Sequence, residues 1–195
     1  MREAKQGSMK MPANVDVLTN GYVGDRVAGT VVLVRENAAV IVIDPGMVAS
    51  RGVILEPLHA FGVKEDDVSD VIFSHHHPDH TLNAALFRNA RFHDVWAIYQ
   101  DDIWGDRTDV IEGAPSVSLL DTPGHTPQDI STLIQTQEGL VVCTHLWWSS
   151  EGPAIDPLAT DQVQLEASRQ KVLDLRPSLI IPGHGHAFSP ADLAR

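Results

Sequence analysis

The chain has a single cysteine, Cys143, among its 195 residues. One thiol excludes an internal disulfide and is typical of a reducing compartment, so we expect a cytoplasmic protein. Because Cys143 belongs to the apolar run 140–143, we expect its thiol to be packed in the interior rather than to bind a metal.

Long apolar stretches and basic residues are also scarce. No run approaches the roughly 18 apolar residues that a membrane-spanning helix needs, and residues 1–9 lack the hydrophobic segment of a secretory signal. The chain has 14 Lys and Arg against 26 Asp and Glu, which gives a net charge of −12. The phosphates of a nucleic acid require a surface rich in Lys and Arg, so the composition argues against a nucleic-acid partner.

The length is that of one domain, and the sequence contains no internal repeat and no low-complexity linker. We expect residues 1–12 to be a leader outside the fold and residues 13–195 to form a single domain. Nothing in the sequence argues for a particular oligomeric state.

Short apolar runs predict many strands and few helices. The strand-like runs are residues 15–18, 30–35, 39–44, 68–74, 91–93, 95–99, 117–120, 131–135, 140–143 and 179–181. Helical periodicity is present at residues 50–61, with Ser50 as the N-cap, and at 81–87 and 161–175. Many strands and few helices in mixed order favour two facing sheets with helices outside, an α+β fold.

The most informative segment is His75-His76-His77-Pro78-Asp79-His80, which directly follows the apolar residues 71–73. Such a group of imidazoles and a carboxylate is unusual core material, because each group would need a buried partner. Zinc and similar metals bind neutral imidazole nitrogen and carboxylate oxygen well. By strand alternation His76 points away from its neighbours, so we do not expect it to be a ligand.

Two further histidines follow other predicted strands. His125 lies in Thr122-Pro123-Gly124-His125, and His184 lies in Pro182-Gly183-His184. In both places a strand runs into a Pro-Gly turn, whose glycine lets a loop approach an ion closely. Together with the segment 75–80, these histidines predict a metal site.

These motifs resemble the metallo-β-lactamase superfamily, over about residues 15–188. Asp44-Pro45-Gly46 resembles the first motif of that family, in which the aspartate braces the site; the segment 75–80 matches the second, His125 the third and His184 the last. The resemblance implies a four-layer αββα sandwich, the metallo-β-lactamase fold. It also implies two metal sites, one held by His75, His77 and His125 and the other by Asp79, His80 and His184.

A narrower resemblance points to the metallo-β-lactamase domain-containing protein 1 group. It is carried by residues 122–125 with the following Gln128-Asp129-Ile130-Ser131, and by residues 166–173 running on to Pro182-Gly183-His184-Gly185.

The fourth motif departs from the family pattern. In the family a strand ends in Gly-Asp, and that aspartate bridges both metals, whereas here the strand 140–143 is followed by Thr144-His145. A neutral imidazole is a poor bridge. Two divalent ions with Asp79 and one hydroxide would leave a charge of about +2, instead of about +1 with a bridging aspartate. Several alternatives stay open. The second ion binds more weakly, the substrate supplies an anionic group, or His145 binds metal and completes a different geometry; otherwise His145 swings aside and Asp79 alone carries the second site.

The resemblance implies a metal-dependent hydrolase that attacks with a metal-bound hydroxide. We expect Zn²⁺, two ions per chain, with Fe or Mn as alternatives. Asp79 would orient the hydroxide and later hand a proton to the leaving group. The expected partner is a small-molecule substrate: an ester, a thioester or a lactone.

Two other interpretations use the same residues. One is a mononuclear-iron oxidoreductase similar to thiol or persulfide dioxygenases, with His75, His77, His125 and His145 around one iron. The other is a metal-binding protein that lost catalysis together with the bridging carboxylate.

Tryptophans mark two candidate pocket walls. Residues 101–113 include Trp104, and Trp147-Trp148 begin two positions after His145, so we expect both indoles of the pair near the metals. There they would either line an apolar part of the substrate pocket or pack at a sheet edge. His59, His93 and His186 have no orderly partners in the sequence, and we expect them to be structural or exposed.

Overall fold

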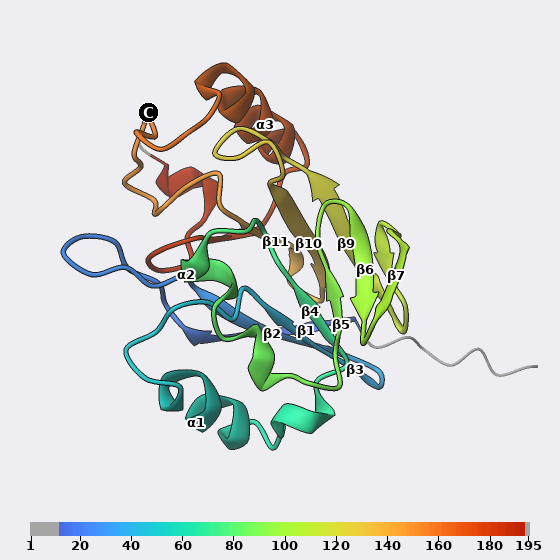
Figure 1. The fold of residues 1–195 in the computed structure, drawn as a ribbon. Coiled ribbons are helices and arrows are strands. Elements are labelled where there is room, and N and C mark those ends of the chain that lie inside the picture. Colours follow the sequence, from blue (N-terminus) through green and yellow to red (C-terminus); the bar gives the residue numbers. More distant parts are fainter. Residues whose placement is uncertain (1–11, 194–195) are drawn as a thin grey trace, which may run out of the picture.

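The computed structural model describes residues 12–193, which form two mixed β-sheets packed face to face with helices outside (Figure 1). The expected leader, residues 1–12, lies outside the described residues apart from Pro12. The seven-stranded sheet has the order β1 (Asn14–Thr19), β2 (Val31–Glu36), β3 (Ala39–Ile43), β4 (Asp70–Ile72), β5 (Arg91–His93), β6 (Ala97–Gln100) and β7 (Ile103–Asp106). The five-stranded sheet has the order β12 (Leu179–Pro182), β11 (Gly139–Thr144), β10 (Ile130–Thr136), β9 (Ala114–Asp121) and β8 (Val110–Ile111).

Strand β2 shows how the sequence builds the layers. Its residues are buried on both faces, and side chains along a strand alternate between the faces. Val32 and Val34 therefore pack against the second sheet in the central core, whereas Val31 and Leu33 pack outward. The outward cluster includes Ile54 and Leu58 of α1 (Gly52–Ala60).

The second sheet is covered in the same way. Val142 of β11 and Ile180 of β12 pack on Leu165 and Val172 of α3 (Gln162–Asp174). Figure 1 shows α1 on one side of the paired sheets and α3 on the other. The order helix, sheet, sheet, helix confirms the predicted four-layer αββα sandwich and the α+β class. No helix among residues 12–193 has the length and the apolar character needed to cross a lipid bilayer.

The helix boundaries differ from the sequence-based expectation at two places. The helix expected at residues 81–87 is wrong: α2 is Pro78–Thr81, and a separate 3₁₀ turn follows at Ala84–Leu86. Proline fits the first turn of a helix because its missing N–H has no partner there, so Pro78 starts α2 early. Ser50 is also not the N-cap of α1, since Arg51 occupies that position.

Most of the other predicted strands and helices are confirmed by the structure. The expected helix 161–175 begins with Asp161 as its N-cap, whose carboxylate accepts from the main-chain N–H of Gln164 at 2.9 Å. The apolar pattern does not predict strands β7 and β8. Both lie within residues 101–113, where acidic residues interrupt the apolar alternation. Two further 3₁₀ helices are Glu65–Asp67 and Pro190–Asp192.

Candidate metal centre

The side chains expected to bind metal come together at one edge of the sandwich, from loops that follow four different strands. Those strands are β4, β9, β11 and β12. Three sets have their ligand atoms within 4.8 Å of one another: His75, His77 and His125; His75, His80 and His145; and Asp79, His80 and His184. All seven residues singled out from the sequence belong to at least one set. Their role as ligands stays a prediction.

The turn at residues 75–80 is held by close backbone packing. His77 has extended backbone and caps α2, and its carbonyl accepts from the N–H of His80 at 3.0 Å. The carbonyl of Asp79 accepts from the N–H of Gly29 at 3.0 Å. A Cβ at Gly46 would overlap that same carbonyl, so only glycine fits in the Asp44-Pro45-Gly46 loop.

Four of the histidines have one ring nitrogen fixed by a group outside the cluster. The Nδ1 of His80 is 2.9 Å from Oδ2 of Asp44, and the Nδ1 of His125 is 2.7 Å from Oδ2 of Asp156. The remaining contacts are His184 Nδ1 to the Ala28 carbonyl at 2.8 Å and His75 Nδ1 to Ser74 Oγ at 3.0 Å. Partners of this kind orient metal-binding imidazoles and fix which nitrogen stays free.

The other ring nitrogens face one another. Within residues 12–193, His75 Nε2, His80 Nε2 and His145 Nδ1 are buried without a hydrogen-bond partner. Oδ2 of Asp79 lies 3.3 Å from His80 Nε2 and 3.6 Å from His184 Nε2. Burying polar ring nitrogens without hydrogen-bond partners is unfavourable, and metal cations coordinated by imidazole and carboxylate would satisfy them. The donor set therefore fits a metal centre.

The protonation states of the cluster also suit metal binding. Burial lowers the pKa of His75 and of His145 well below 6.5, and it lowers the pKa of His125 and His184. These rings are therefore neutral at pH 7, the form that binds metal.

His80 and Asp79 form a charge pair in the metal-free protein. Burial acts to lower the pKa of His80, but Asp44 and Asp79 outweigh it and raise that pKa to about 9. Burial acts to raise the pKa of Asp79, but the charge and close approach of His80 outweigh it and bring that pKa to about 2. A metal that binds at His80 must displace a proton.

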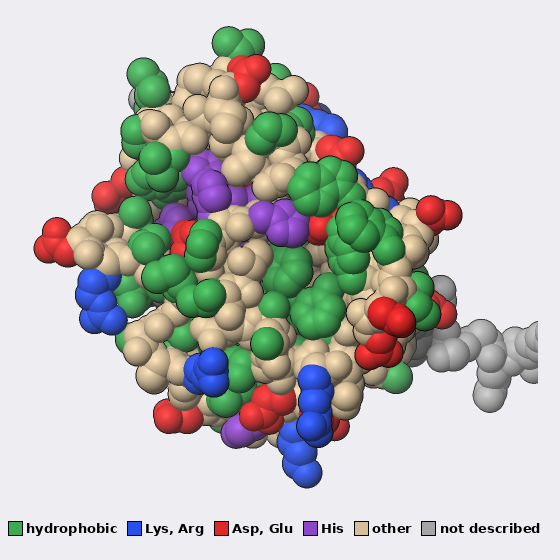
Figure 2. All heavy atoms as spheres, in the orientation of Figure 1, with side chains coloured by type: hydrophobic (Ala, Val, Ile, Leu, Met, Phe, Trp, Pro, Cys, Tyr) green, Lys and Arg blue, Asp and Glu red, His purple; other side chains and the backbone are tan. Residues whose placement is uncertain are grey.

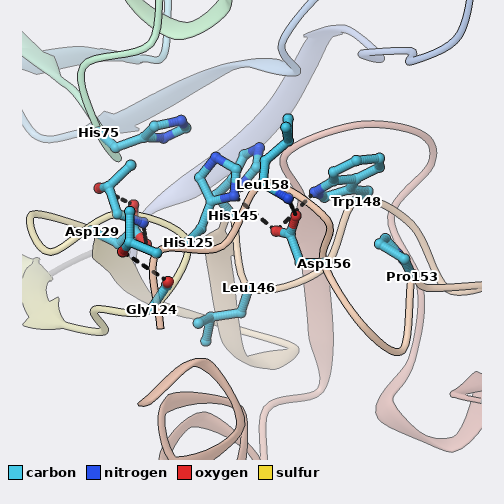
Figure 3. Close-up of polar contacts among 12 residues, drawn as sticks. His75, Gly124, His125, Asp129, His145, Leu146, Trp148, Pro153, Asp156 and Leu158 are labelled. Atoms are coloured by element: carbon cyan, nitrogen blue, oxygen red, sulfur yellow. Dashed lines mark hydrogen bonds and ion pairs between the residues drawn. The ribbon is translucent and has the colours of Figure 1, made fainter. Parts of the chain in front are cut away.

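Asp156 is a site residue that sequence reasoning missed. It is buried, and its Oδ2 accepts from Trp148 Nε1 at 3.2 Å as well as facing His125. Figure 3 shows the Asp156 carboxylate directed toward both rings. Asp156 belongs to an irregular segment between β11 and α3, where no periodic pattern or motif distinguishes it from a surface aspartate.

Only one of the two tryptophans lies where the sequence suggested. The Trp148 ring centre is 6.2 Å from that of His184. The expectation for Trp147 is wrong: its side chain is buried in the outer cluster with Phe188, at 6.3 Å between ring centres, under the guanidinium of Arg169. Consecutive residues point in opposite directions here, so one ring faces the site and the other the core.

Comparison with known proteins assigns the family. Residues 24–184 match the sequence profile of the Metallo-beta-lactamase superfamily. The chain belongs to the metallo-beta-lactamase superfamily. Metallo-beta-lactamase domain-containing protein 1 of Xenopus laevis is 34% identical over 192 residues, which cover 91% of this chain and 82% of the frog protein. The human protein of the same name is 31% identical over 158 residues, or 76% of this chain and 59% of its own length. These matches confirm the family and the group that the motifs resemble.

The match spans about 60% of the length of the mouse, rat and human relatives. Among solved structures, a Thermotoga maritima protein classed with the metallo-beta-lactamases has a TM-score of 0.71 at 23% identity, over 92% of this chain and all of that one. A quorum-quenching N-acyl homoserine lactone lactonase has a TM-score of 0.64 at 19% identity, over 91% of this chain and 93% of that one. These likenesses confirm the fold.

His145, at the fourth-motif position of this superfamily member, is the central ring of the cluster. Its ring centre lies 4.2 Å from that of His125, 4.5 Å from His75 and 4.8 Å from His80. Its Nε2 is 3.3 Å from His184 Nε2, so it also contacts the group on the other side. His145 packs so closely on Gly183 that a Cβ there would overlap the ring. The imidazole therefore points into the cluster and has not swung aside.

Proposed function

We propose that this chain is a hydrolase with two divalent metal ions, most simply zinc, that acts on a small ester, thioester or lactone. In this assignment His75, His77 and His125 hold one ion, and Asp79, His80 and His184 hold the other. His145 lies between the two groups and replaces the usual bridging carboxylate as a ligand.

The observation that supports the proposal best is the set of buried ring nitrogens that face one another while their opposite nitrogens are fixed. Asp44, Asp156 and the Ala28 carbonyl each hold one histidine of the cluster in place. An arrangement with oriented outer nitrogens and free inner nitrogens costs stability unless cations occupy the centre.

The chemistry follows from the donor set. A divalent ion bound here would supply hydroxide at neutral pH, because it lowers the pKa of water from about 16 to about 7. Asp79 is only partly buried and its pKa is held at about 2, so its carboxylate is ionised and partly accessible to solvent. Asp79 would accept a hydrogen bond from the attacking group, orient it, and pass a proton to the leaving group.

The substrate class rests on two arguments. Hydroxide attack on a carbonyl suits esters, thioesters and lactones. A structure of similar fold is an N-acyl homoserine lactone hydrolase with the product N-hexanoyl-L-homoserine at its catalytic metal centre, with a TM-score of 0.64 at 19% identity. That hydrolase supports a substrate of this kind without fixing which one this chain accepts.

The test combines metal analysis with turnover. Elemental analysis of the purified protein should give two zinc ions per chain, and a panel of small esters, thioesters and lactones should contain a substrate. His77→Ala and Asp79→Ala should lower turnover at least a hundredfold, whereas His59→Ala, an exposed histidine paired with Glu65, should not.

Other outcomes would replace the proposal. A single iron per chain, with oxygen consumed in the presence of a thiol, would favour a mononuclear-iron oxidoreductase. Tight metal binding without turnover of any substrate would favour a binding protein. Near-normal turnover by Asp79→Ala would contradict the role given to Asp79.

A further inference from the structure

A second aromatic feature lies beside the candidate metal centre. The rings of His76 and Trp96 are stacked, with centres 5.3 Å apart and planes 24° from parallel. His76 comes from the metal-site turn and Trp96 from the loop between β5 and β6. We call this pair the His76–Trp96 platform.

The platform is fixed from beneath by one buried carboxylate. Asp94 is 1% exposed, and its Oδ2 lies 3.0 Å from His76 Nε2 and accepts from the Tyr99 hydroxyl at 2.8 Å. Its Oδ1 accepts from the N–H groups of Trp96 at 2.7 Å and Ala97 at 2.9 Å. A buried carboxylate requires such partners, and here they hold both the His76 ring and the Trp96 backbone in one arrangement.

The platform shares the turn at residues 75–80 with the candidate metal ligands. His76 lies between His75 and His77 in the chain, and His77 and Asp79 are the partly exposed members of the turn, whereas His75 and His80 are buried. Figure 2 shows histidines gathered in a hollow of the surface, with a further histidine at its rim flanked by large hydrophobic side chains. A substrate whose reacting bond enters this hollow would have its remaining atoms near the rim.

The exposure of Trp96 is unusual for a residue held so firmly. Trp96 is 56% exposed although its backbone N–H is hydrogen-bonded to Asp94. Burial of an exposed aromatic ring under a ligand removes apolar surface from water, which favours binding of the ligand. A rigid aromatic face binds a flat ring at low entropic cost.

We propose that the His76–Trp96 platform binds an uncharged aromatic group of the substrate and so determines specificity, an inference that rests on the proposed hydrolase. Stacked rings favour a planar π system over a branched alkyl group. Asp101, Asp102 and Asp106 are exposed on the neighbouring hairpin of β6 and β7 and disfavour an anionic substituent.

Trp104 on β7 offers a matched control on the neighbouring hairpin of β6 and β7. It is 72% exposed, more than Trp96, but it packs edge-on against Tyr99, at 4.8 Å and 70°, and not on His76. If an exposed tryptophan were sufficient to bind an aromatic group, Trp104 would bind it as well as Trp96.

The first experiment measures binding without requiring turnover. The zinc-loaded protein, with 5-fluorotryptophan at its four tryptophans, is titrated with 3-phenylpropionate and with propionate, and ¹⁹F spectra are recorded. Trp96→Phe identifies the Trp96 signal. We expect 3-phenylpropionate to shift the Trp96 signal and not that of Trp104, and to bind about tenfold more tightly than propionate.

The second experiment measures specificity by turnover. Ethyl 3-phenylpropionate and ethyl butyrate share the same leaving group, so their ratio of kcat/KM reports recognition of the phenyl ring. Trp96→Ala should lower this ratio about tenfold, mainly through KM, whereas Trp96→Phe should retain most of it and Trp104→Ala all of it. Zinc content should be the same in all variants.

The outcomes separate this inference from the proposed function. Hydrolysis of both esters with an unchanged ratio in Trp96→Ala would overturn the platform and leave the hydrolase standing. A Trp96 shift with no hydrolysis of any ester would contradict the hydrolase and keep the platform as a ligand site. The absence of any Trp96 shift in the wild type would overturn the platform.

Discussion

The Nδ1 of His125 lies 2.7 Å from Oδ2 of Asp156, and both side chains are buried. The same carboxylate accepts from Trp148 Nε1, and its other oxygen accepts from the N–H of Leu158. One aspartate therefore couples the orientation of a proposed metal ligand to the irregular segment between β11 and α3.

Asp156→Ala should weaken zinc binding about 10- to 100-fold, because His125 loses the group that orients its ring. Competition with a chromophoric chelator measures the affinity. Glu151→Ala is the matched control, since Glu151 is an exposed acidic residue of the same segment. Unchanged affinity in a folded Asp156→Ala protein would contradict the role of Asp156.

Gly46→Ala should destabilise the protein by about 3 kcal/mol and reduce its zinc content, because the added Cβ overlaps the Asp79 carbonyl and displaces the metal-site turn. Urea unfolding measures the loss. Gly24→Ala is the control: a Cβ at Gly24 meets no atom within 4 Å, so its free energy of unfolding should change by less than about 0.5 kcal/mol. Equal effects of both substitutions would show that the overlap is relieved without cost.

Asp129 should make the metal-free protein less stable as the pH rises. Burial raises the pKa of this carboxyl from 3.8 to about 7, although hydrogen bonds from Thr126 oppose the shift. Between these two values the folded state keeps a proton that the unfolded state has lost, so the free energy of unfolding falls with rising pH. The fall attributable to Asp129 is on the order of 4 kcal/mol by pH 8.

Asp129→Asn isolates this effect, because asparagine is neutral at every pH. His80, whose pKa is raised to about 9, titrates in both proteins, and its charge lowers the Asp129 pKa only in the wild type. The measurement is urea unfolding at pH 5, 6, 7 and 8 after removal of metal. The free energy of unfolding of the variant should rise relative to that of the wild type up to about pH 7. A constant difference between the two free energies of unfolding over this range would mean that the Asp129 pKa is not raised.

His145→Ala should lower the zinc content from two ions to one per chain, and His145→Asp should restore two. The reason is that His145 contacts histidines of both proposed sites, and a carboxylate can bridge them. Elemental analysis after gel filtration measures the content. Two zinc ions in both variants would mean that His145 is not a ligand and that Asp79 alone separates the sites.

Much of the fold and of the candidate site was readable in the sequence for one reason: the informative signals are local. Alternating apolar residues mark strands such as β2, and the residues that follow those strands carry the imidazoles. His75, His125 and His184 each come directly after a strand or its Pro-Gly turn, so pattern and chemistry coincide in a few consecutive residues. The family motifs added their order along the chain, which the match to residues 24–184 confirms.

The sequence by itself determined the fold class, the family and the set of imidazoles and carboxylates that meet at one edge. Tertiary structure alone decided which groups orient them. Asp156 and Asp94 contact histidines 31 and 18 positions earlier in the chain, and neither stands in a pattern that marks it. Long-range hydrogen bonds depend on how loops pack onto the sandwich, and packing brings together residues that no local periodicity connects. The same reason separates Trp148 from Trp147 and Trp96 from Trp104. Trp148 lies near His184 and Trp96 stacks on His76, whereas Trp147 packs on Phe188 and Trp104 on Tyr99.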